Sequence, residues 1–244
     1  MEEKIQQFLL EMNQNFYDGY ARSFSSTRQT IQPGIRLLLP DLLQSVRILD
    51  LGCGNGNLAK ELLEAGFEGD YVGLDISQGL LKEASELIDE KRKKQFNFIH
   101  ANLASDWSEF SVHGNFDSIV SFAILHHLPL EKIQKNFFEQ IESMLLPGGS
   151  FYLSTWQVKN NRRLQNRIQP WSTVGLDQYL LTEDDLLLDW RAEPSLPPKY
   201  RYVRHYSSAL LRQLGDSARL ELTKEFFSDG KEGDLALYQV WKKR

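Results

Sequence analysis

The sequence predicts an α/β protein with a doubly wound parallel sheet, and three observations carry this prediction. Short apolar runs alternate with segments of helical periodicity from about residue 45 to residue 156. Two of the apolar runs end in an acid, at Asp50 and Asp75. The first leads directly into a glycine-rich turn, Gly52-Cys53-Gly54-Asn55-Gly56. Because regular alternation of strands and helices builds parallel sheets covered by helices on both faces, the sequence favours one large α/β domain.

Length and composition fit such a domain. The 244 residues can bury a sizeable core, and 41% hydrophobic with 25% charged residues is ordinary for a globular protein. No signal-peptide pattern and no apolar run of about eighteen residues is present, so we expect a cytoplasmic protein that does not engage a membrane. The net charge of −5 argues against indiscriminate nucleic-acid binding, though not against a local basic patch.

Residues 1–44 predict a helical cap. Apolar residues recur with helical spacing at Ile5, Phe8, Leu9, Met12 and Phe16, which indicates an amphipathic helix. We expect a polar, aromatic loop over residues 17–28 and a second helix over residues 33–43.

Residues 45–156 predict the core of the sheet. We expect strands over residues 46–51, 70–75, 96–100, 116–121 and 151–156. The helices between them are expected from Asn57, over Gln78–Glu90, and along a stripe that starts at Ile133. The basic run Lys91–Lys94 would end the helix over Gln78–Glu90 as exposed, solvated charge. The alternative is that this run forms a basic patch that binds RNA.

The pattern changes after residue 156. Residues 157–206 are rich in Asn, Arg, Pro and Trp and lack a long period, so we interpret them as an inserted substrate cap. Residues 207–244 predict a short helix followed by two strands, over residues 220–226 and 235–241, that form an antiparallel hairpin.

The glycine-rich turn is typical of a nucleotide-binding element. Glycine lets the backbone adopt φ > 0 and leaves no Cβ between the main chain and a ligand, while the next helix directs free N–H groups at the turn. The spacing Gly52-x-Gly54-x-Gly56 differs from the Gly-x-Gly-x-x-Gly of dinucleotide-binding folds and disfavours NAD. The alternative is that these glycines only form a tight turn between strand and helix.

Asp75 lies about twenty residues after the turn, where such folds place a carboxylate on ribose hydroxyls. The alternative is that Asp75 caps the following helix, although Ser77 is the better capping candidate.

The order of motifs from Arg47 to Trp156 resembles the class I S-adenosylmethionine (SAM)-dependent methyltransferases. The resemblance implies SAM as cofactor and that family's Rossmann-like seven-stranded sheet, with a C-terminal hairpin and an inserted substrate cap. Asn102 stands where the family commonly has Asp, and its amide oxygen can accept the same hydrogen bond. The core residues that the resemblance assigns to the cofactor are Asp50, Gly52, Cys53, Gly54, Gly56, Asp75, Ile76, Asn102, Leu103, Ser121 and Phe122.

Motifs in the flanks resemble the tRNA wobble-uridine carboxymethyl methyltransferases, which esterify 5-carboxymethyluridine in the anticodon loop. These motifs are Tyr17-Asp18-x-x-Ala21-x-x-Phe24-Ser25-x-Thr27-Arg28, Ile124-x-His126-His127-Leu128, Leu186-x-Leu188-x-Trp190-Arg191 and Arg201-Tyr202. The resemblance implies tRNA as a partner, leaves room for a small activating protein subunit, and places Tyr20 and Arg28 near the cofactor. It places Trp190, Arg191, Arg201 and Tyr202 near the modified base. Two departures concern acceptor recognition: Asp189 replaces the usual proline, and Val203-Arg204 replaces Tyr-His.

The implied reaction needs few catalytic residues. A carboxylate with a pKa of about 4 is already ionised at neutral pH, so the protein has only to position it and exclude water. Because a guanidinium can hold a carboxylate through two hydrogen bonds, we expect Arg28, Arg201 and Arg204 in the catalytic site, with His126. Arginines are concentrated in the loop and the cap, and the alternative is that they are exposed solubilising charge.

The pair His126-His127 also suggests a metal ligand or a general base. No Cys or carboxylate stands at ligand spacing, so we expect no metal. A base and a packing role stay open.

Three functions follow from the sequence. The first is methylation of the wobble carboxymethyl group. The second is methylation of a small metabolite that carries a carboxylate, hydroxyl or amine. The third is a SAM-binding partner subunit without activity.

Overall fold

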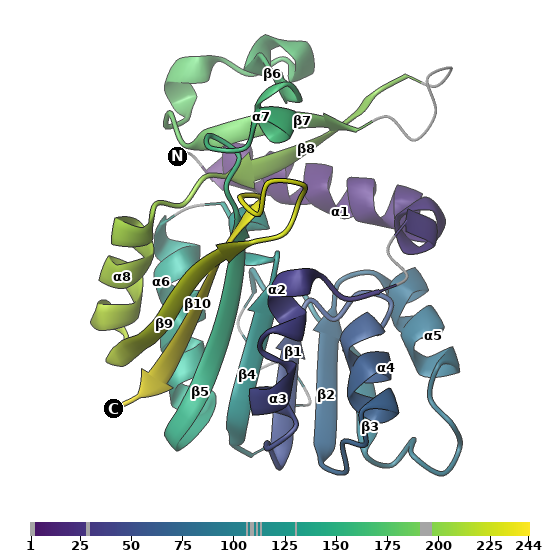
Figure 1. The fold of residues 1–244 in the computed structure, drawn as a ribbon. Helices are drawn as coiled ribbons and strands as arrows, with labels where there is room; N and C mark the ends of the chain where they lie inside the picture. The colour runs from purple at the N-terminus through teal and green to yellow at the C-terminus, as the bar shows by residue number, and fades with distance from the viewer. Residues whose placement is uncertain are drawn as a thin grey trace.

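The computed structural model describes residues 3–27, 30–105, 107, 110, 112, 114–129, 131–190 and 197–244; for residue 18 and residues 20–27 it describes the backbone alone. A seven-stranded sheet with the order β3-β2-β1-β4-β5-β10-β9 forms its centre (Figure 1). The first five strands in this order are parallel, and β10 runs antiparallel to both of its neighbours. The strands are β1 (Arg47–Leu51), β2 (Asp70–Asp75), β3 (Phe96–His100), β4 (Phe116–Phe122), β5 (Leu145–Trp156), β9 (Leu220–Ser228) and β10 (Ala236–Lys243).

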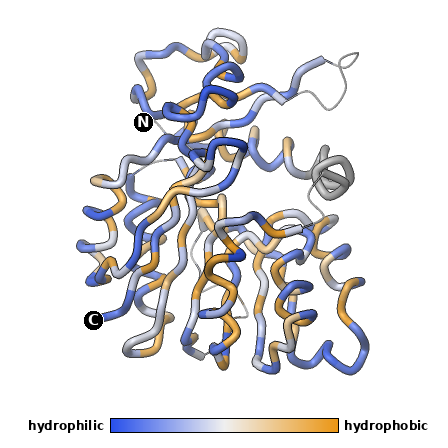
Figure 2. The backbone as a smooth tube through the Cα atoms, in the orientation of Figure 1, coloured by the Kyte–Doolittle hydropathy of each residue, from blue (hydrophilic) through white to orange (hydrophobic). Residues whose placement is uncertain are grey.

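Helices cover both faces of this sheet. Side chains alternate along each strand, so neighbouring residues of β1 face different layers. Ile48 packs in a cluster with α2 to α4, whereas Leu49 packs in a cluster with α6 and α8. Figure 2 shows the apolar tracts that follow the central strands. The helices of these layers are α2 (Pro33–Arg36), α3 (Leu39–Leu42), α4 (Asn57–Glu64), α5 (Gln78–Glu86), α6 (Glu131–Met144) and α8 (Ser208–Ser217).

A second, three-stranded antiparallel sheet lies above the carboxyl ends of the parallel strands, with the order β6-β7-β8 (Figure 1). The long helix α1 (Glu3–Thr27) contacts β8 and α5, and therefore lies between the two sheets. We call residues 157–206 the cap. Its elements are α7 (Arg162–Gln165), β6 (Ile168–Gln169), η3 (Trp171–Val174), η4 (Gln178–Leu180), β7 (Asp185–Trp190) and β8 (Lys199–Arg204).

The fold class, the strands of the core and the C-terminal hairpin are confirmed, and three details of the prediction are wrong. The loop expected over residues 17–28 is helical as far as Thr27, because contacts with β8 and α5 extend the helix beyond its apolar stripe. The helix expected over residues 33–43 is divided into α2 and α3, since Pro40 cannot donate the bond that a continuous helix requires there. Helix α5 ends at Glu86, so Lys91–Lys94 lie in turns after the helix.

None of the helices in the described part of the chain is long and apolar enough to cross a membrane.

Candidate active site

A cavity of about 570 Å³ lies where the carboxyl ends of the parallel strands face the cap. Its floor is formed by the glycine-rich turn after β1, the end of β2 and the loop after β4. Its walls come from α1, the cap and the turn between β9 and β10. A crevice at this edge of a doubly wound sheet is the usual place for a ligand.

The glycine-rich turn leaves its backbone open to the cavity. Gly54 has a φ of 55°, and a Cβ at this position would meet no atom within 4 Å. Gly52 has a φ of 83°, and a Cβ there would lie 2.1 Å from Cδ1 of Ile124. A ligand can therefore lie directly on the main chain at Gly54, while Gly52 is required for packing. Gly56 does not line the cavity; it is the N-cap residue of α4 and packs on Ala84.

Asp75 joins the two loops on the cavity floor. Its Oδ2 accepts a hydrogen bond of 2.9 Å from the Gly54 amide, and its Oδ1 accepts one of 2.9 Å from the Ser77 amide. The N-cap of α5 is Ser77, whose Oγ accepts from the Leu80 amide, so Asp75 is not the capping residue. Asp75 lines the cavity and holds the turn in place.

Asp50 is the second acid on the cavity floor and is only 4% exposed. The Tyr71 hydroxyl donates a hydrogen bond to its Oδ2. Burial raises the pKa of Asp50 to about 7; the bond from Tyr71 lowers this pKa, and the charge of Asp75 raises it further. This carboxyl group therefore changes protonation near neutral pH.

The other residues expected at the cofactor occupy different places. Cys53, Ile76, Asn102, Leu103 and Phe122 line the cavity. The Asn102 Oδ1 accepts a hydrogen bond of 3.0 Å from the Ala104 amide. Ser121 is fully buried and does not reach the cavity. Arg28 and the side chain of Tyr20 lie outside the described residues.

The two histidines have different surroundings. His126 is fully buried, does not line the cavity and stacks on Trp156, with ring centroids 4.7 Å apart. His127 lines the cavity, and its Nε2 lies 2.6 Å from the Tyr17 hydroxyl of α1. The sequence placed His126 in the catalytic site, but the histidine that lines the cavity is His127. The described residues contain no group of three or more His, Cys, Asp or Glu that could hold a metal ion.

Arg201 lies in an aromatic cage at the cavity wall and is 5% exposed. Its guanidinium carbon lies 4.5 Å from the ring centroid of Trp156, 4.9 Å from that of Phe16 and 5.9 Å from that of Trp190. Burial lowers the pKa of Arg201, while the side chain of Tyr17 favours its charged form. Because arginine stays protonated in proteins, a cation faces the cavity.

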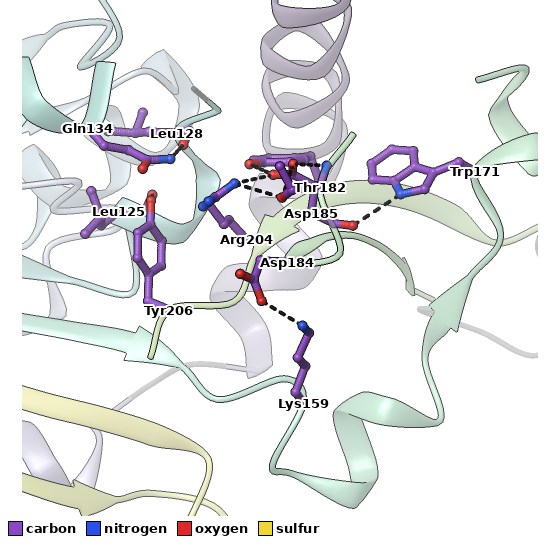
Figure 3. Close-up of polar contacts among 11 residues, drawn as sticks. Leu125, Leu128, Gln134, Lys159, Trp171, Thr182, Asp184, Asp185, Arg204 and Tyr206 are labelled. Carbon is purple, nitrogen blue, oxygen red and sulfur yellow. Dashed lines mark hydrogen bonds and ion pairs between the residues drawn. The ribbon is translucent and has the colours of Figure 1, made fainter. Parts of the chain in front are cut away.

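Arg204 and Tyr202 do not line the cavity. Figure 3 shows the Arg204 side chain directed at Asp185 and Thr182. Arg204 Nη1 is 3.1 Å from Oδ1 of the fully buried Asp185 side chain, and the Tyr202 hydroxyl donates to the same oxygen at 2.7 Å. The other oxygen of Asp185 accepts from the Thr182 amide and hydroxyl, at 2.9 and 2.8 Å. This network ties β7 to β8, so Arg204 and Tyr202 hold the cap together, in contrast to the expected site roles.

Two further arginines of the cap, Arg163 and Arg167, line the cavity together with Trp190. Arg167 Nη1 lies 3.4 Å from Oδ1 of Asp189, which is one of the two departures from the wobble-uridine family. Arg191 lies outside the described residues.

The sequence did not indicate Asn13 or Trp156 as site residues, and it offered Tyr17 only within a flanking motif and His127 only as a possible base in a pair with His126. Their partners lie up to 189 residues away in the chain, so no local spacing reports these contacts. The signals in the sequence were the motif that begins at Tyr17 and the pair His126-His127.

The residues on the cavity floor fit SAM. An exposed backbone at Gly54 suits the methionyl half, Asp75 can accept from ribose hydroxyls, and apolar Ile76 and Leu103 can flank an adenine ring.

Comparisons with known proteins agree with this interpretation. A family model described as a methyltransferase domain matches residues 42–190. Among curated proteins, a tRNA (carboxymethyluridine(34)-5-O)-methyltransferase of Arabidopsis thaliana is 32% identical over 67% of this chain and 37% of its own length. A macaque protein with the same activity in its name is 31% identical, and the match covers only 20% of its length. A malonyl-[acyl-carrier protein] O-methyltransferase of Ilyobacter polytropus is 26% identical over 90% of this chain and 85% of its own length.

Solved structures support the fold. A SAM-dependent methyltransferase from Methanosarcina mazei has a TM-score of 0.63 at 21% identity, with 88% of this chain and 98% of that chain covered. The magnesium protoporphyrin IX methyltransferase of Synechocystis with bound SAM has a TM-score of 0.55 at 16% identity, with 94% and 82% covered. With the cavity geometry and the family match, these findings show that the chain belongs to the SAM-dependent methyltransferases of class I fold, with SAM as its cofactor.

Proposed function

We propose that this protein transfers a methyl group from SAM to the carboxylate of 5-carboxymethyluridine at the wobble position of tRNA. The observation that carries the proposal is Arg201, a buried cation at the cavity wall. No ion pair joins its guanidinium to a carboxylate among the residues that the structure describes. A buried guanidinium without a counter-ion is costly, and an acceptor that brings a carboxylate offsets this cost.

The geometry of the arginine suits a carboxylate. A guanidinium presents its N–H groups as a planar fork, which can hold both oxygens of one carboxylate. The aromatic rings around Arg201 restrict its motion and exclude water, so the side chain loses less conformational entropy when an acceptor binds. We therefore assign Arg201 the role of acceptor anchor.

The chemical step needs positioning more than proton transfer. SAM supplies an electrophilic methyl group on a sulfonium. The acceptor carboxylate oxygen bonds to the methyl carbon while the methyl–sulfur bond breaks and its electron pair stays on sulfur. The products are a methyl ester and S-adenosylhomocysteine, and no proton moves. Arg201 holds the carboxylate, and the cavity walls keep it in line and dry.

Two features support an RNA acceptor. Arg163 and Arg167 place further cations at the cap side of the cavity, beside Trp190. Single-stranded RNA is recognised by arginines on phosphates and by aromatic stacking on bases that are turned out of the loop. The similarity to tRNA carboxymethyluridine methyltransferases supports the same acceptor.

A second candidate acceptor is a malonyl thioester. The match to the Ilyobacter enzyme covers 90% of this chain, more than the matches to the tRNA enzymes do. This acceptor also ends in a free carboxylate, which Arg201 could hold in the same way.

The test measures transfer of a labelled methyl group from SAM to tRNA that carries 5-carboxymethyluridine. A malonyl thioester of acyl-carrier protein and a tRNA with unmodified wobble uridine serve in parallel reactions. We expect label on the carboxymethylated tRNA alone, removable by saponification as an ester requires. The assay includes any small protein that co-purifies from the native host, which we propose as an activating subunit. Label on the malonyl thioester alone would establish the second candidate.

A further inference from the structure

Residues 30–35 contain the start of α2 and form one wall of the cavity. Ile31, Gln32 and Ile35 line it. Ile31 and Ile35 are buried in the same apolar cluster as Leu58, which lies in the first turn of α4, directly after the glycine-rich turn. Because Leu58 lines the cavity as well, this wall lies next to the part of the floor that fits SAM.

The short helix in this wall is held by a distant side chain. Helix α2 has only four residues, and a helix of this length is not stable by itself. The first amides of a helix have no partner within it. The amide of Gly34, the second residue of α2, donates to Oδ1 of Asp229 at 2.8 Å. Asp229 is only 5% exposed and lies in the turn between β9 and β10, 195 residues further along the chain.

Asp229 binds a second group at the same wall. Its Oδ2 accepts a hydrogen bond of 2.6 Å from the Tyr238 hydroxyl. Burial raises the pKa of Tyr238 and the charge of Asp229 raises it further, so this hydroxyl keeps its proton and remains a donor. Gly34 lies directly on the ring of Tyr238, because a Cβ at Gly34 would be 2.3 Å from Cε2 of the ring. Asp229 therefore fixes both the start of α2 and the ring on which α2 rests.

The turn that carries Asp229 is itself fixed to the cap. The Gln157 amide donates to the Leu235 carbonyl at 2.9 Å, and the Leu235 amide donates to the Asp229 carbonyl at 3.2 Å. Asn161, the N-cap residue of α7, donates from Nδ2 to Oδ1 of Asp234 at 2.7 Å. The wall beside the cofactor is thus joined, through Asp229, to a turn that the cap holds in place.

We propose that Asp229 is a positioning residue for the cofactor: through Gly34 and Tyr238 it holds residues 30–35 in the place where they cover bound SAM. Both oxygens of Asp229 are bonded to donors of the protein itself, so the residue acts on the cofactor through the wall and not by direct contact. Since SAM is the cofactor whichever acceptor is methylated, this role does not depend on the acceptor.

Asp229→Asn tests this role. Asparagine tolerates the positive φ of 71° at this position, but its amide nitrogen cannot accept a hydrogen bond. We expect the Kd of S-adenosylhomocysteine and the KM of SAM to rise about 10-fold, with kcat and the acceptor KM close to the wild type. The matched control is Asp117→Asn. Asp117 also accepts backbone amides, from Val46 at 2.9 Å and Arg47 at 2.8 Å, but does not line the cavity, so the affinity for S-adenosylhomocysteine should stay unchanged.

Gly34→Ala is a second variant that leaves the carboxylate in place. Its Cβ forces α2 and the Tyr238 ring apart, so we expect the same rise in Kd and KM. If Asp229→Asn weakens binding and Gly34→Ala does not, Asp229 acts on the ligand directly and the positioning role is wrong. A fall in kcat with unchanged KM for SAM, or an equal loss of affinity in Asp117→Asn, would show a general structural effect and would also overturn it.

Two measurements need no acceptor. Calorimetry with S-adenosylhomocysteine decides the affinities, so absence of methylation on tRNA refutes the tRNA acceptor and not the role of Asp229. In the wild type, the Gly34 amide should exchange slowly with solvent, although the first amides of a helix usually exchange freely. Exchange of this amide at the rate of a free amide would contradict the positioning role even if a variant failed to fold.

Discussion

Gly54 and Asp75 make separable contributions to cofactor binding. Gly54→Val places a side chain in the space where the ligand lies, so we expect loss of S-adenosylhomocysteine binding in calorimetry. Gly148→Val is the matched control, because Gly148 also has positive φ with open space around it but lies outside the cavity. Both variants should lose about 1–2 kcal/mol of stability through backbone strain. Asp75→Ala should weaken binding about 10-fold or more through lost charged hydrogen bonds. If Gly54→Val binds S-adenosylhomocysteine with unchanged affinity, the ligand does not lie on the main chain at Gly54.

Asp50 makes stability depend on pH. In the folded protein its pKa is raised from 3.8 to about 7, so the folded state binds a proton that the unfolded state releases. The free energy of unfolding therefore falls as the pH rises from about 4 to about 7, by at most about 1.4 kcal/mol per pH unit. Above about pH 7 this group makes no further change to stability. Urea unfolding between pH 5 and pH 8 should show this slope in the wild type and lose it in Asp50→Asn. Parallel curves for the two proteins would contradict the assignment.

A buried ion pair between Asp185 and Arg204 holds the cap together. Asp185→Asn leaves the charge of Arg204 poorly compensated, and we expect a loss of up to about 3–5 kcal/mol in unfolding free energy. Asp184→Asn is the adjacent control, because its pair with Lys159 is about one-third exposed and should contribute less than about 1 kcal/mol. Neither variant should change affinity for S-adenosylhomocysteine, since neither residue lines the cavity. Equal losses of stability would show that burial of Asp185 has no special effect.

The cap also offers a contrast between neighbouring arginines on α7. Arg163 lines the cavity, whereas Arg162 does not. We expect Arg163→Ala to weaken tRNA binding and to reduce the slope of log affinity against log salt by about 0.7–0.9, the value for one phosphate contact. Arg162→Ala should leave both quantities close to the wild type in fluorescence anisotropy titrations. If the slope of log affinity against log salt is the same in both variants, Arg163 does not contact a phosphate of the RNA.

The elements differ in how well the sequence predicts them. Strands β1, β2 and β4 are short apolar runs buried along most of their length, and a buried parallel strand needs little more. Strand β5 begins at Leu145, earlier than the expected residue 151, and its start was missed because its first residues include the exposed Pro147 and two glycines. The cap strand β7 was missed because Asp185–Trp190 is buried on both faces, so it shows no alternation of polar and apolar residues. The last turns of α1 were missed because contacts with other elements, and not a local stripe, keep them helical. Arg201 was predicted as a site residue from a family motif, but its aromatic cage joins α1, β5, β7 and β8 and has no local signature.

The cavity is lined by segments that are far apart in the chain. Residues from α1, the β1 and β4 loops, the cap and the β9–β10 turn all line it. In that last turn, Asp229 accepts from the Gly34 amide at 2.8 Å and from the Tyr238 hydroxyl at 2.6 Å, which fastens the C-terminal hairpin to α2. A ligand that fills this cavity would therefore lie between α1, the loops of the core sheet, the cap and the C-terminal hairpin.

Binding of S-adenosylhomocysteine should thus stabilise the chain as a unit. At a ligand concentration of about 100 times Kd, linkage gives about 2.7 kcal/mol, so we expect one thermal transition that moves to higher temperature. Hydrogen exchange should slow in α1 and in the β9–β10 turn as well as in the glycine-rich turn. The reason is that all three segments line the same cavity, so a bound ligand contacts them together. NAD at the same concentration should give neither effect. Protection confined to residues 52–76 would show that the ligand orders the floor of the cavity alone, and would contradict this prediction.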